Sequence, residues 1–503
     1  MPQELPGFYY DPEKNRYFPI KGPIPGSSRY PSSSSTTISN SQIPSSKSNE
    51  AIEKLNTLKR KRIRIAKLLQ VRELHGKVLN FNQLRCNFQQ EYQMMQASHP
   101  VIWKYQSTDR IADSALEQLH VDIQTAQGQS ETDVLLMGNM NGSLSLFEFG
   151  RVGQLFDYGV KCMPDCVWPL TMENQSDCSE APGHLWRPTG ALTLMPSCIS
   201  CIKRSGKHYM DTADDNSVIQ NALITTLGSE TSGGSIFVLN LSEPLEFSPS
   251  IPVLRRRLFE VASLNCTIWT ADCNSNGTEA IVGTSLGAAL VNLETGVPSW
   301  VCRSKSDVFS QQFNQSGNVV VCGLRNGAIV TVDVRQRQEA FSARLPRHRV
   351  PYRANKGSEA SSRNFKNATK QWFELKGNIH PSCTIFMPSS ISSLVSLQSY
   401  DQYFLASSMD GSIYLYDHRL LKRGAIQSYE GHVNSHTRIQ LGVDPSERLV
   451  LSGGEDGNLR IWSIKTGEML FRNKISNLVP STVCWTGSGA WLGSREGIVF
   501  MQR

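Results

Sequence analysis

A repeated pair of strands is the feature that most constrains the fold of this chain. Seven segments each contain a run of apolar and β-branched residues, a tight turn that includes Gly, and a second run in which apolar residues alternate. Such alternation predicts half-buried β-strands, and Gly supplies the positive φ that short hairpin turns need. The sequence therefore predicts an all-β domain built from seven hairpins, at 134–149, 224–241, 280–293, 319–335, 403–419, 449–463 and 490–501.

The spacing of the turn glycines predicts how the hairpins are arranged. These glycines are 92, 53, 40, 84, 46 and 40 residues apart, at Gly142, Gly234, Gly287, Gly327, Gly411, Gly457 and Gly497. Three intervals lie near the period of about 40–45 residues that is typical of propeller blades. The two longest contain polar, loop-like sequence at 172–183 and a basic insertion at about 341–380. We predict a seven-bladed β-propeller over residues 99–503; eight or nine thinner blades are the alternative.

The ring of blades needs a strand from elsewhere to close. The seventh hairpin runs to the end of the printed sequence, so its blade lacks an outer strand. Because closure removes the open sheet edge that invites aggregation, a strand before the first blade is expected to complete this blade. The apolar run Val101–Tyr105 is the best candidate.

The first 98 residues predict an extension of a different kind. Residues 1–48 contain the aromatic box PGFYYDPEKNRYF (6–18), followed by Ser- and Pro-rich sequence that buries too little apolar surface to fold, so we expect disorder there. Residues 49–98 are basic, and apolar residues recur at helical spacing before Gly76. A second helical stretch is predicted at 80–96. The extension is thus expected to be disordered and partly helical.

Charge is concentrated in two segments. The chain carries +7, but residues 51–85 hold ten Lys/Arg against two Glu, and residues 341–380 hold nine against two. The remainder is therefore acidic. The cluster KRKRIR (59–64) predicts a nuclear-import signal, so we expect a nuclear protein that can also reside in the cytoplasm. The sequence contains no apolar run of membrane-spanning length, so no membrane partner is expected.

The sequence offers no pattern typical of catalysis or cofactor binding. Phosphate-binding loops, serine-hydrolase elbows and zinc-protease motifs do not occur, so we expect a non-enzymatic protein without a cofactor. The pairs Cys162/Cys166 and Cys198/Cys201 lack the second pair of a zinc finger, so no metal site is expected and the cysteines are interpreted as reduced thiols. The basic segments lack interleaved aromatic residues, which argues against specific nucleic-acid binding.

One segment resembles a WD repeat closely. YEGHVN (429–434) provides the Gly-His pair that opens such a repeat, and GEDGNLRIWS (454–463) provides its end. The resemblance identifies the propeller as a WD40 propeller. It also implies a structural, buried chain of hydrogen bonds through four residues, His432, Ser452, Asp456 and Trp462.

Two consecutive hairpins end in a DxR box. The boxes are Val332–Arg335 and Tyr416–Arg419, and in both the usual Trp before Asp is replaced, by Val and Tyr. They resemble the docking box of the WD-repeat substrate receptors of cullin-4 RING ubiquitin ligases. The resemblance implies that the damaged-DNA-binding adaptor of these ligases is bound by Asp333, Arg335, Asp417 and Arg419.

Further segments carry the same likeness. The aromatic box, SDVFSQQF (306–313) and YEGHVN follow one another as in one member of that receptor family. The family resemblance implies a substrate-recognition subunit: one rim of the propeller binds the adaptor, the other presents an unidentified protein target, and the cullin and RING subunits carry the chemistry. The segment 49–96 is placed to enter a cleft of the adaptor. A WD-repeat scaffold for a nuclear complex, without a ubiquitin link, is the alternative function.

Overall fold

The computed structural model describes the strand residues 8–11, 16–19, 78–79 and 85–86, and most of the chain from residue 88 onward. In that longer part the described ranges are 88–106, 112–125, 128–150, 159–169, 181–205, 221–229, 231–247, 252–335, 345–351, 372–379 and 383–502. Contacts divide the chain into two compact units, Met1–Arg85 and Cys86–Arg503. The second unit begins before residue 99, where the propeller domain was predicted to start.

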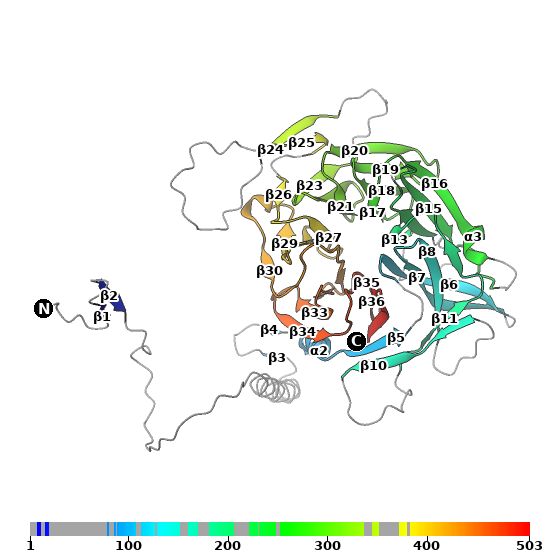
Figure 1. Cartoon of the computed structure of the whole chain (residues 1–503), viewed down its shortest axis with the longest axis horizontal. Coiled ribbons are helices and arrows are strands. Elements are labelled where there is room, and N and C mark those ends of the chain that lie inside the picture. The colour runs from blue at the N-terminus through cyan, green and yellow to red at the C-terminus, as the bar shows by residue number, and fades with distance from the viewer. Residues whose placement is uncertain are drawn as a thin grey trace, which may run out of the picture. The chain divides into compact units, whose positions relative to one another are not determined.

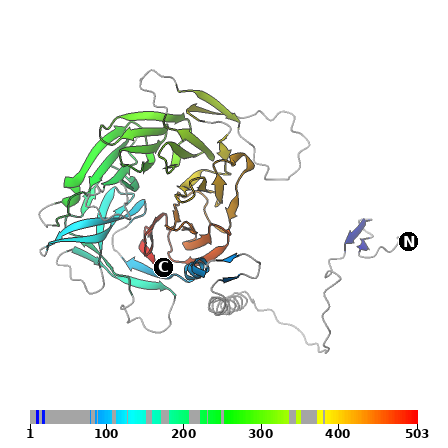
Figure 2. The ribbon, with the colours of Figure 1, turned by 180° about the vertical axis from the view of Figure 1, so that it is seen from behind.

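The second unit is a seven-bladed β-propeller, as predicted. Seven antiparallel sheets surround a central axis (Figures 1 and 2). In the first three blades the strands, from the axis outward, are as follows. Blade 1 has β6 (Ala115–Thr125), β7 (Gly128–Gly138), β8 (Ser143–Gly150), β11 (His184–Pro188) and β9 (Gly159–Cys162), with β12 (Leu192–Leu194) also paired to β8. Blade 2 has β13 (Ile199–Ser205), β14 (Asn221–Thr226), β15 (Gly234–Asn240) and β16 (Leu258–Leu264). Blade 3 has β17 (Ile268–Cys273), β18 (Glu279–Thr284), β19 (Gly287–Asn292), β20 (Pro298–Ser304), β25 (Trp372–Gly377) and β24 (Arg347–Pro351).

The other four blades follow the same plan. Blade 4 has β21 (Val308–Phe313), β22 (Val319–Leu324), β23 (Ala328–Asp333) and β26 (Ile385–Phe386). Blade 5 has β27 (Ile391–Ser396), β28 (Tyr403–Ser408), β29 (Ile413–Asp417) and β30 (Gln427–Tyr429), with the short helix η3 (Leu421–Arg423) before its outer strand. Blade 6 has β31 (Leu441–Val443), β32 (Leu449–Ser452), β33 (Asn458–Ser463) and β34 (Met469–Lys474). Blade 7 has β35 (Thr482–Trp485), β36 (Gly489–Ser494), β37 (Gly497–Gln502), β5 (Val101–Gln106) and β10 (Pro164–Trp168).

The seven predicted hairpins are the second and third strands of the seven blades, counted from the axis. Six of the predicted turn glycines have positive φ, but the turn between β14 and β15 differs. There Gly233 has the positive φ of 64°, while Gly234 is the first residue of β15. A Cβ on Gly233 would meet the carbonyl oxygen of Leu264 at 2.0 Å, so the backbone approach also requires Gly.

The ring closes with the predicted strand. β5 pairs antiparallel with β37, from Val101 opposite Gln502 to Gln106 opposite Gly497. Ile102 and Tyr105 are fully buried, and the Tyr105 hydroxyl donates a hydrogen bond to the Gly183 carbonyl at 2.9 Å. The N-terminal strand of the propeller is thus part of its last blade.

The core lies between neighbouring blades rather than within one of them. Each of the seven hydrophobic clusters of the described residues joins side chains from two adjacent sheets. The innermost strands are also linked from blade to blade by hydrogen bonds. These run from Phe313 N to Asp272 Oδ2 (2.8 Å), Ser396 N to Gln312 Oε1 (2.7 Å), Leu441 N to Ser393 Oγ (3.1 Å) and Gln118 N to Cys484 Sγ (3.3 Å).

The structure corrects the helical prediction before the propeller. The helix α2 spans Phe88–Ala97, whereas the residues before it form a short strand pair, β3 (Val78–Leu79) with β4 (Arg85–Cys86). The predicted basic helix before Gly76 lies outside the described residues.

In the first unit, β1 (Phe8–Asp11) pairs with β2 (Arg16–Pro19), so the aromatic box contains a hairpin. The Ser-rich sequence after it is also outside the described residues.

The basic insertion is partly strand rather than loop. β24 and β25 extend blade 3 outward, and Val350, Phe373 and Leu375 are buried in the cluster between blades 3 and 4. Alternate residues of these strands are apolar, which gives them one face to bury. Two segments lie outside the described residues. They are the residues between β24 and β25, and residues 172–180 of the predicted loop 172–183.

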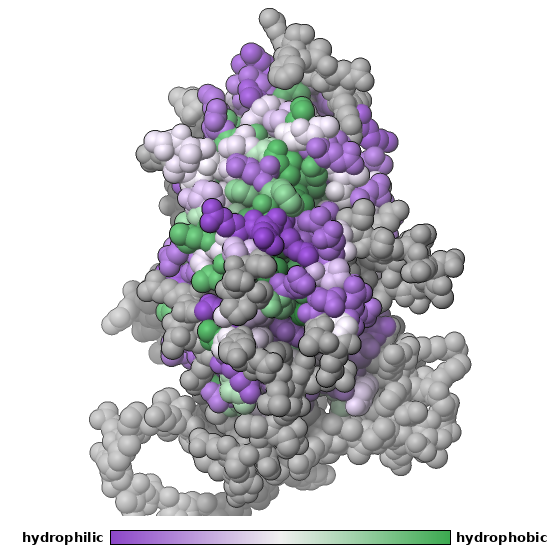
Figure 3. Space-filling model, turned by 90° about the vertical axis from the view of Figure 1, so that its right-hand side faces the viewer, coloured by the Kyte–Doolittle hydropathy of each residue, from purple (hydrophilic) through white to green (hydrophobic). Residues whose placement is uncertain are grey.

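The outer surface is mixed in character. On the side of the short helix α3 (Val253–Arg257), Figure 3 shows a hydrophobic area next to a hydrophilic band. Large apolar side chains exposed in the propeller include Leu194 and Phe259. Within the part of the chain that the structure describes, no helix is long and apolar enough to span a membrane.

Candidate functional site

The two DxR boxes have the same local structure. In each box a blade's third strand ends at Asp, and this Asp turns the chain by accepting a backbone hydrogen bond from the Arg two residues on. The Arg335 N to Asp333 Oδ1 distance is 3.0 Å, and the Arg419 N to Asp417 Oδ1 distance is 2.8 Å. Asp333 and Asp417 therefore fix the direction in which the following chain leaves the blade.

The same Asp holds the side chain of the Arg. Arg419 donates from Nε to Asp417 Oδ1 at 3.0 Å and from Nη2 to Oδ2 at 2.8 Å, and Arg335 makes the equivalent bonds to Asp333 at 3.1 and 2.5 Å. Hydrogen bonds from Arg419 lower the pKa of Asp417 below its usual value. Both Arg side chains remain 65% exposed. Each guanidinium is thus oriented by its own box, and its other N–H groups can serve a partner's acceptors.

The residue between Asp and Arg faces the core. Val334 is buried in the cluster between blades 3 and 4. His418 packs its ring on Phe404 with centroids 4.6 Å apart, and burial lowers its pKa. Because neighbouring residues of an extended chain point to opposite sides, this inward residue turns the Arg side chain toward the surface, while Asp417 itself is buried.

Both boxes lie on one rim of the propeller. The four-stranded pattern of each blade is antiparallel, so the third strands of all blades end at the same rim. β23 and β29 are the third strands of consecutive blades, 4 and 5. The structure therefore places the predicted adaptor-binding residues together on one rim, which we call the DxR rim.

The helix α2 lies on the same rim, beside the next blade. Its Gln93 accepts a hydrogen bond from Arg448, which follows the turn between β31 and β32, and its Met94 lies 4.0 Å from the hydroxyl of Ser463, where β33 ends. The helix also contacts β34, and Ala97 is buried with Ile102 in the cluster between blades 6 and 7. The helix lies within the predicted extension 49–98, but it is part of the same compact unit as the propeller.

The predicted WD chain is divided into separate parts. His432 Nε2 lies 3.0 Å from the Gly453 carbonyl oxygen and 3.3 Å from Ser452 Oγ, so these two predicted members meet. Trp462 instead donates to the Glu430 carbonyl at 2.9 Å. His432 Nδ1 has no hydrogen-bond partner, because Asp456 accepts hydrogen bonds from Arg460 and does not reach His432. His432 precedes blade 6 and the other three residues lie in that blade, and the four do not form one continuous chain.

Asp456 is held by Arg460, which is not among the site residues predicted from the sequence. Arg460 is fully buried in β33 and binds both carboxylate oxygens, with Nη1 to Oδ1 at 2.9 Å, and Asn458 donates to Oδ2 at 2.5 Å. Burial alone would raise the pKa of Asp456, but the bonds from Arg460 and Asn458 lower it to about 2. A charged residue between the apolar Leu459 and Ile461 was the signal for this pair.

His432 should make the stability of the protein depend on pH. Burial lowers its pKa from 6.5 to about 4, so the folded protein binds fewer protons than the unfolded chain between these values. The contribution is complete above pH 6.5 and is lost as the pH falls toward 4. Chemical denaturation should therefore show a smaller loss of unfolding free energy across this range in His432→Gln than in wild type. His436→Gln, at a side chain 85% exposed, is the control; equal losses in all three proteins would contradict the prediction.

The described residues contain no group of three His, Cys, Asp or Glu that could hold a metal ion. Of the two cysteine pairs singled out in the sequence, Cys162 and Cys201 are buried in strands, and Cys166 and Cys198 are more accessible. These four cysteines form no disulfide.

The fold and its repeat define the class of protein: the second unit is a WD-repeat β-propeller. The family model "WD domain, G-beta repeat" matches residues 424–463, which contain His432 and Trp462.

Similar proteins point to a narrower group. The chain is 29% identical over 167 residues to "DDB1- and CUL4-associated factor 4" of Bos taurus, which is 33% of this chain and 26% of that protein. It is 27% identical over 202 residues to the protein of the same name from Homo sapiens, 40% of this chain and 32% of that one. An uncharacterised WD-repeat-containing protein of Caenorhabditis elegans is 23% identical over 278 residues, 54% of this chain and 44% of that one. The alignments thus span less than half of each relative, and they support a similarity to cullin-4-associated WD-repeat proteins.

Proposed function

We propose that this protein is the substrate-recognition subunit of a cullin-4 RING ubiquitin ligase and binds the damaged-DNA-binding adaptor through its DxR rim. One observation carries the proposal: consecutive blades present two arginines with the same orientation, the same exposure and the same Asp partner. Similarity to proteins named as DDB1- and CUL4-associated factors supports the choice of adaptor.

The arrangement suits docking on a larger protein. An arginine that is already oriented loses less side-chain entropy on binding than a free one, and it can donate to carboxylate or carbonyl oxygens of the adaptor. The helix α2, on the next blade of the same rim, extends this surface. The opposite rim is left for the target, and the cullin and RING subunits of the complex would supply the ubiquitin-transfer chemistry.

Loss of both rim arginines should release the adaptor. Arg335→Ala/Arg419→Ala removes two exposed anchors, and hot-spot arginines cost about 1–2 kcal/mol each, so the affinity should fall by roughly 30-fold or more. Co-purification of the adaptor and cullin-4 with the tagged full chain measures this, followed by titration with the purified adaptor. Arg303→Ala/Lys376→Ala, on the opposite rim of blade 3, is the matched control and should retain the adaptor.

Two results would count against the proposal. Full recovery of the adaptor with the Arg335/Arg419 variant would exclude the DxR boxes as the contact. Absence of adaptor and cullin from the wild-type complex would favour a scaffold without a ubiquitin link. A deletion that tests the extension should cover 49–85 and stop there, because the compact unit begins at Cys86 and α2 belongs to it.

We also propose that the basic cluster 59–64 directs the protein to the nucleus. It lies outside the described residues, so the sequence alone supports this proposal. Replacement of its Lys and Arg by Ala should move a fluorescently tagged chain to the cytoplasm. An unchanged nuclear fraction would contradict it, and the Arg335/Arg419 variant serves as a control of equal expression.

A further inference from the structure

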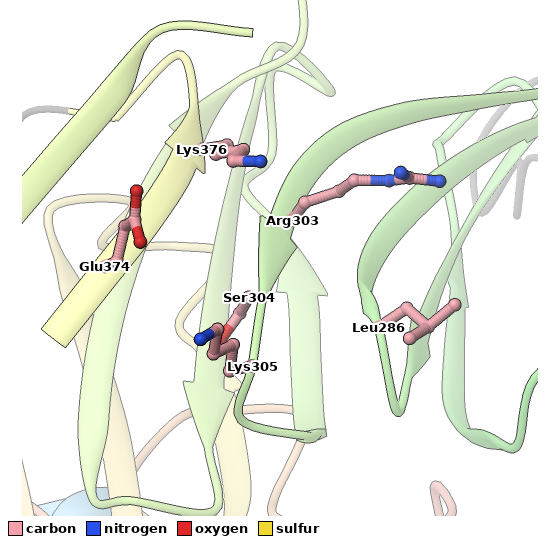
Figure 4. A pocket seen from close by; sticks show the side chains of 6 residues that line it. All are labelled: Leu286, Arg303, Ser304, Lys305, Glu374 and Lys376. Atoms are coloured by element: carbon pink, nitrogen blue, oxygen red, sulfur yellow. The ribbon is translucent and has the colours of Figure 1, made fainter.

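A small basic hollow lies beside the fourth and fifth strands of blade 3. It has a volume of about 200 Å³ and is lined by Leu286, Arg303, Ser304, Lys305, Glu374 and Lys376 (Figure 4). Three cations and one carboxylate line it, so its charge is positive. Figure 4 shows Arg303 and Lys376 on neighbouring strands, Leu286 in the turn that precedes β19, and Glu374 further along β25.

The positions of the basic residues in the sheet cause repulsion between like charges. In the sheet, Arg303 of β20 is paired with Lys376 of β25, and Lys376 is paired with Arg347 of β24. Paired residues of antiparallel strands lie on the same face, so three basic residues form a row across three strands. Like charges that are directly opposite one another destabilise a sheet. An anionic partner bound to this row would offset the repulsion between these charges by attraction to each of them.

The hollow also has features that suit a protein segment. Arg303 is held in place, with its guanidinium 4.6 Å from the ring centre of Trp300. Leu286 is 47% exposed and offers an apolar wall, while Glu374 can accept N–H groups of a peptide. A nucleic acid gains affinity from cations spread along many phosphates, whereas these cations gather around a hollow the size of one or two side chains.

The hollow opens at the rim opposite the DxR boxes. β20 is antiparallel to β19, and third strands such as β19 end at the DxR rim, so β20 ends at the other rim. Arg303 and Ser304 are its last residues, and Leu286 lies in the turn between β18 and β19 at that same rim. A partner bound here would leave the DxR rim free.

We propose that this hollow binds an acidic segment of a partner protein, in which a carboxylate or phosphoserine side chain is held by Arg303, Lys305 and Lys376 and an apolar neighbour packs on Leu286. The binding itself is independent of the ubiquitin-ligase assignment; it rests on that proposed function only in naming the bound protein as the target for ubiquitination.

The test measures binding of fluorescein-labelled peptides to the full chain by fluorescence anisotropy. The probe is a short peptide with a Leu beside a run of Glu, compared with the same peptide carrying Gln and with one carrying phosphoserine. We expect the acidic peptides to bind about tenfold more tightly than the Gln peptide at low salt, since each ion pair contributes modestly. Arg303→Glu/Lys376→Glu should abolish this difference, and Glu374→Gln should increase it.

Matched variants make the outcome decisive. Arg335→Ala/Arg419→Ala should bind the acidic peptides like wild type, and Arg303→Glu/Lys376→Glu should still co-purify with the adaptor. Equal binding of acidic and Gln peptides, or no binding of any peptide, would overturn this inference alone and leave the adaptor proposal standing. Tighter binding of a single-stranded oligonucleotide than of the acidic peptides, lost in the same charge-reversed variant, would overturn it in favour of a nucleic-acid site. The ratio between the Glu and phosphoserine peptides tells which anion the hollow prefers.

Discussion

A chain that begins at residue 107, directly after β5, is expected to lose the folded propeller, whereas a chain that begins at Cys86 should keep it. Removing β5 leaves β37 as an open edge. It also removes the buried side chains of Ile102, Trp103 and Tyr105 from the core. Burial of a large apolar side chain contributes roughly 1.5–3 kcal/mol, so the three together contribute about 6 kcal/mol. This is comparable to the whole stability of a domain, which is typically about 5–15 kcal/mol.

Thermal unfolding and size-exclusion chromatography measure this effect. The chain from Cys86 should unfold cooperatively as a monomer, and the chain from residue 107 should aggregate or show no transition, because an open strand edge pairs with other chains. A point variant, Ile102→Asp, keeps the strand but buries a carboxylate among apolar residues, and it should also be strongly destabilised. A cooperative transition at the wild-type temperature in the chain from residue 107 would show that β5 is dispensable.

Replacement of Asp456 by Ala is expected to destabilise the protein by about 3 kcal/mol, because it leaves the fully buried Arg460 without its partner. The double variant Asp456→Ala/Arg460→Leu removes both charges and should recover much of this loss. Chemical denaturation of the wild type and the variants gives the coupling energy of the pair. Asp410→Ala is the control: Asp410 is exposed in the matching turn of blade 5, where Tyr414 replaces the arginine, so its loss should cost below about 1 kcal/mol.

Asp456 should also give the protein an acid-sensitive contribution to stability. Its pKa falls from 3.8 to about 2 in the folded state, so its contribution is complete above pH 3.8 and is lost as the pH falls toward 2. The Asp456→Ala variant should lack this component, while Asp410→Ala should keep it. A wild type and an Asp456→Ala variant with parallel pH profiles in this range would contradict the assigned pair.

The sequence predicted more of the fold than of the site. The hairpins and the closing strand could be predicted because strand alternation and turn glycines are local features. The two DxR boxes could be placed at strand ends, since Asp follows an apolar run in both. The role of Arg460 could not be predicted from the resemblance to WD repeats. That resemblance implies a hydrogen-bonded chain that joins Asp456 to His432, whereas in this protein Asp456 binds Arg460.

The remaining features depend on residues that are distant in the sequence. Local pattern alone determined that this chain forms seven strand pairs with a basic extension, since each pair needs its own alternation and its own turn. Tertiary packing decided that α2 belongs to the propeller, that part of the basic insertion forms the edge of blade 3, and that Arg303 is paired with Lys376 in the sheet. The physical reason is that sheet register and packing between blades bring together segments that are far apart in the sequence, and the local pattern of one segment does not specify its distant partner.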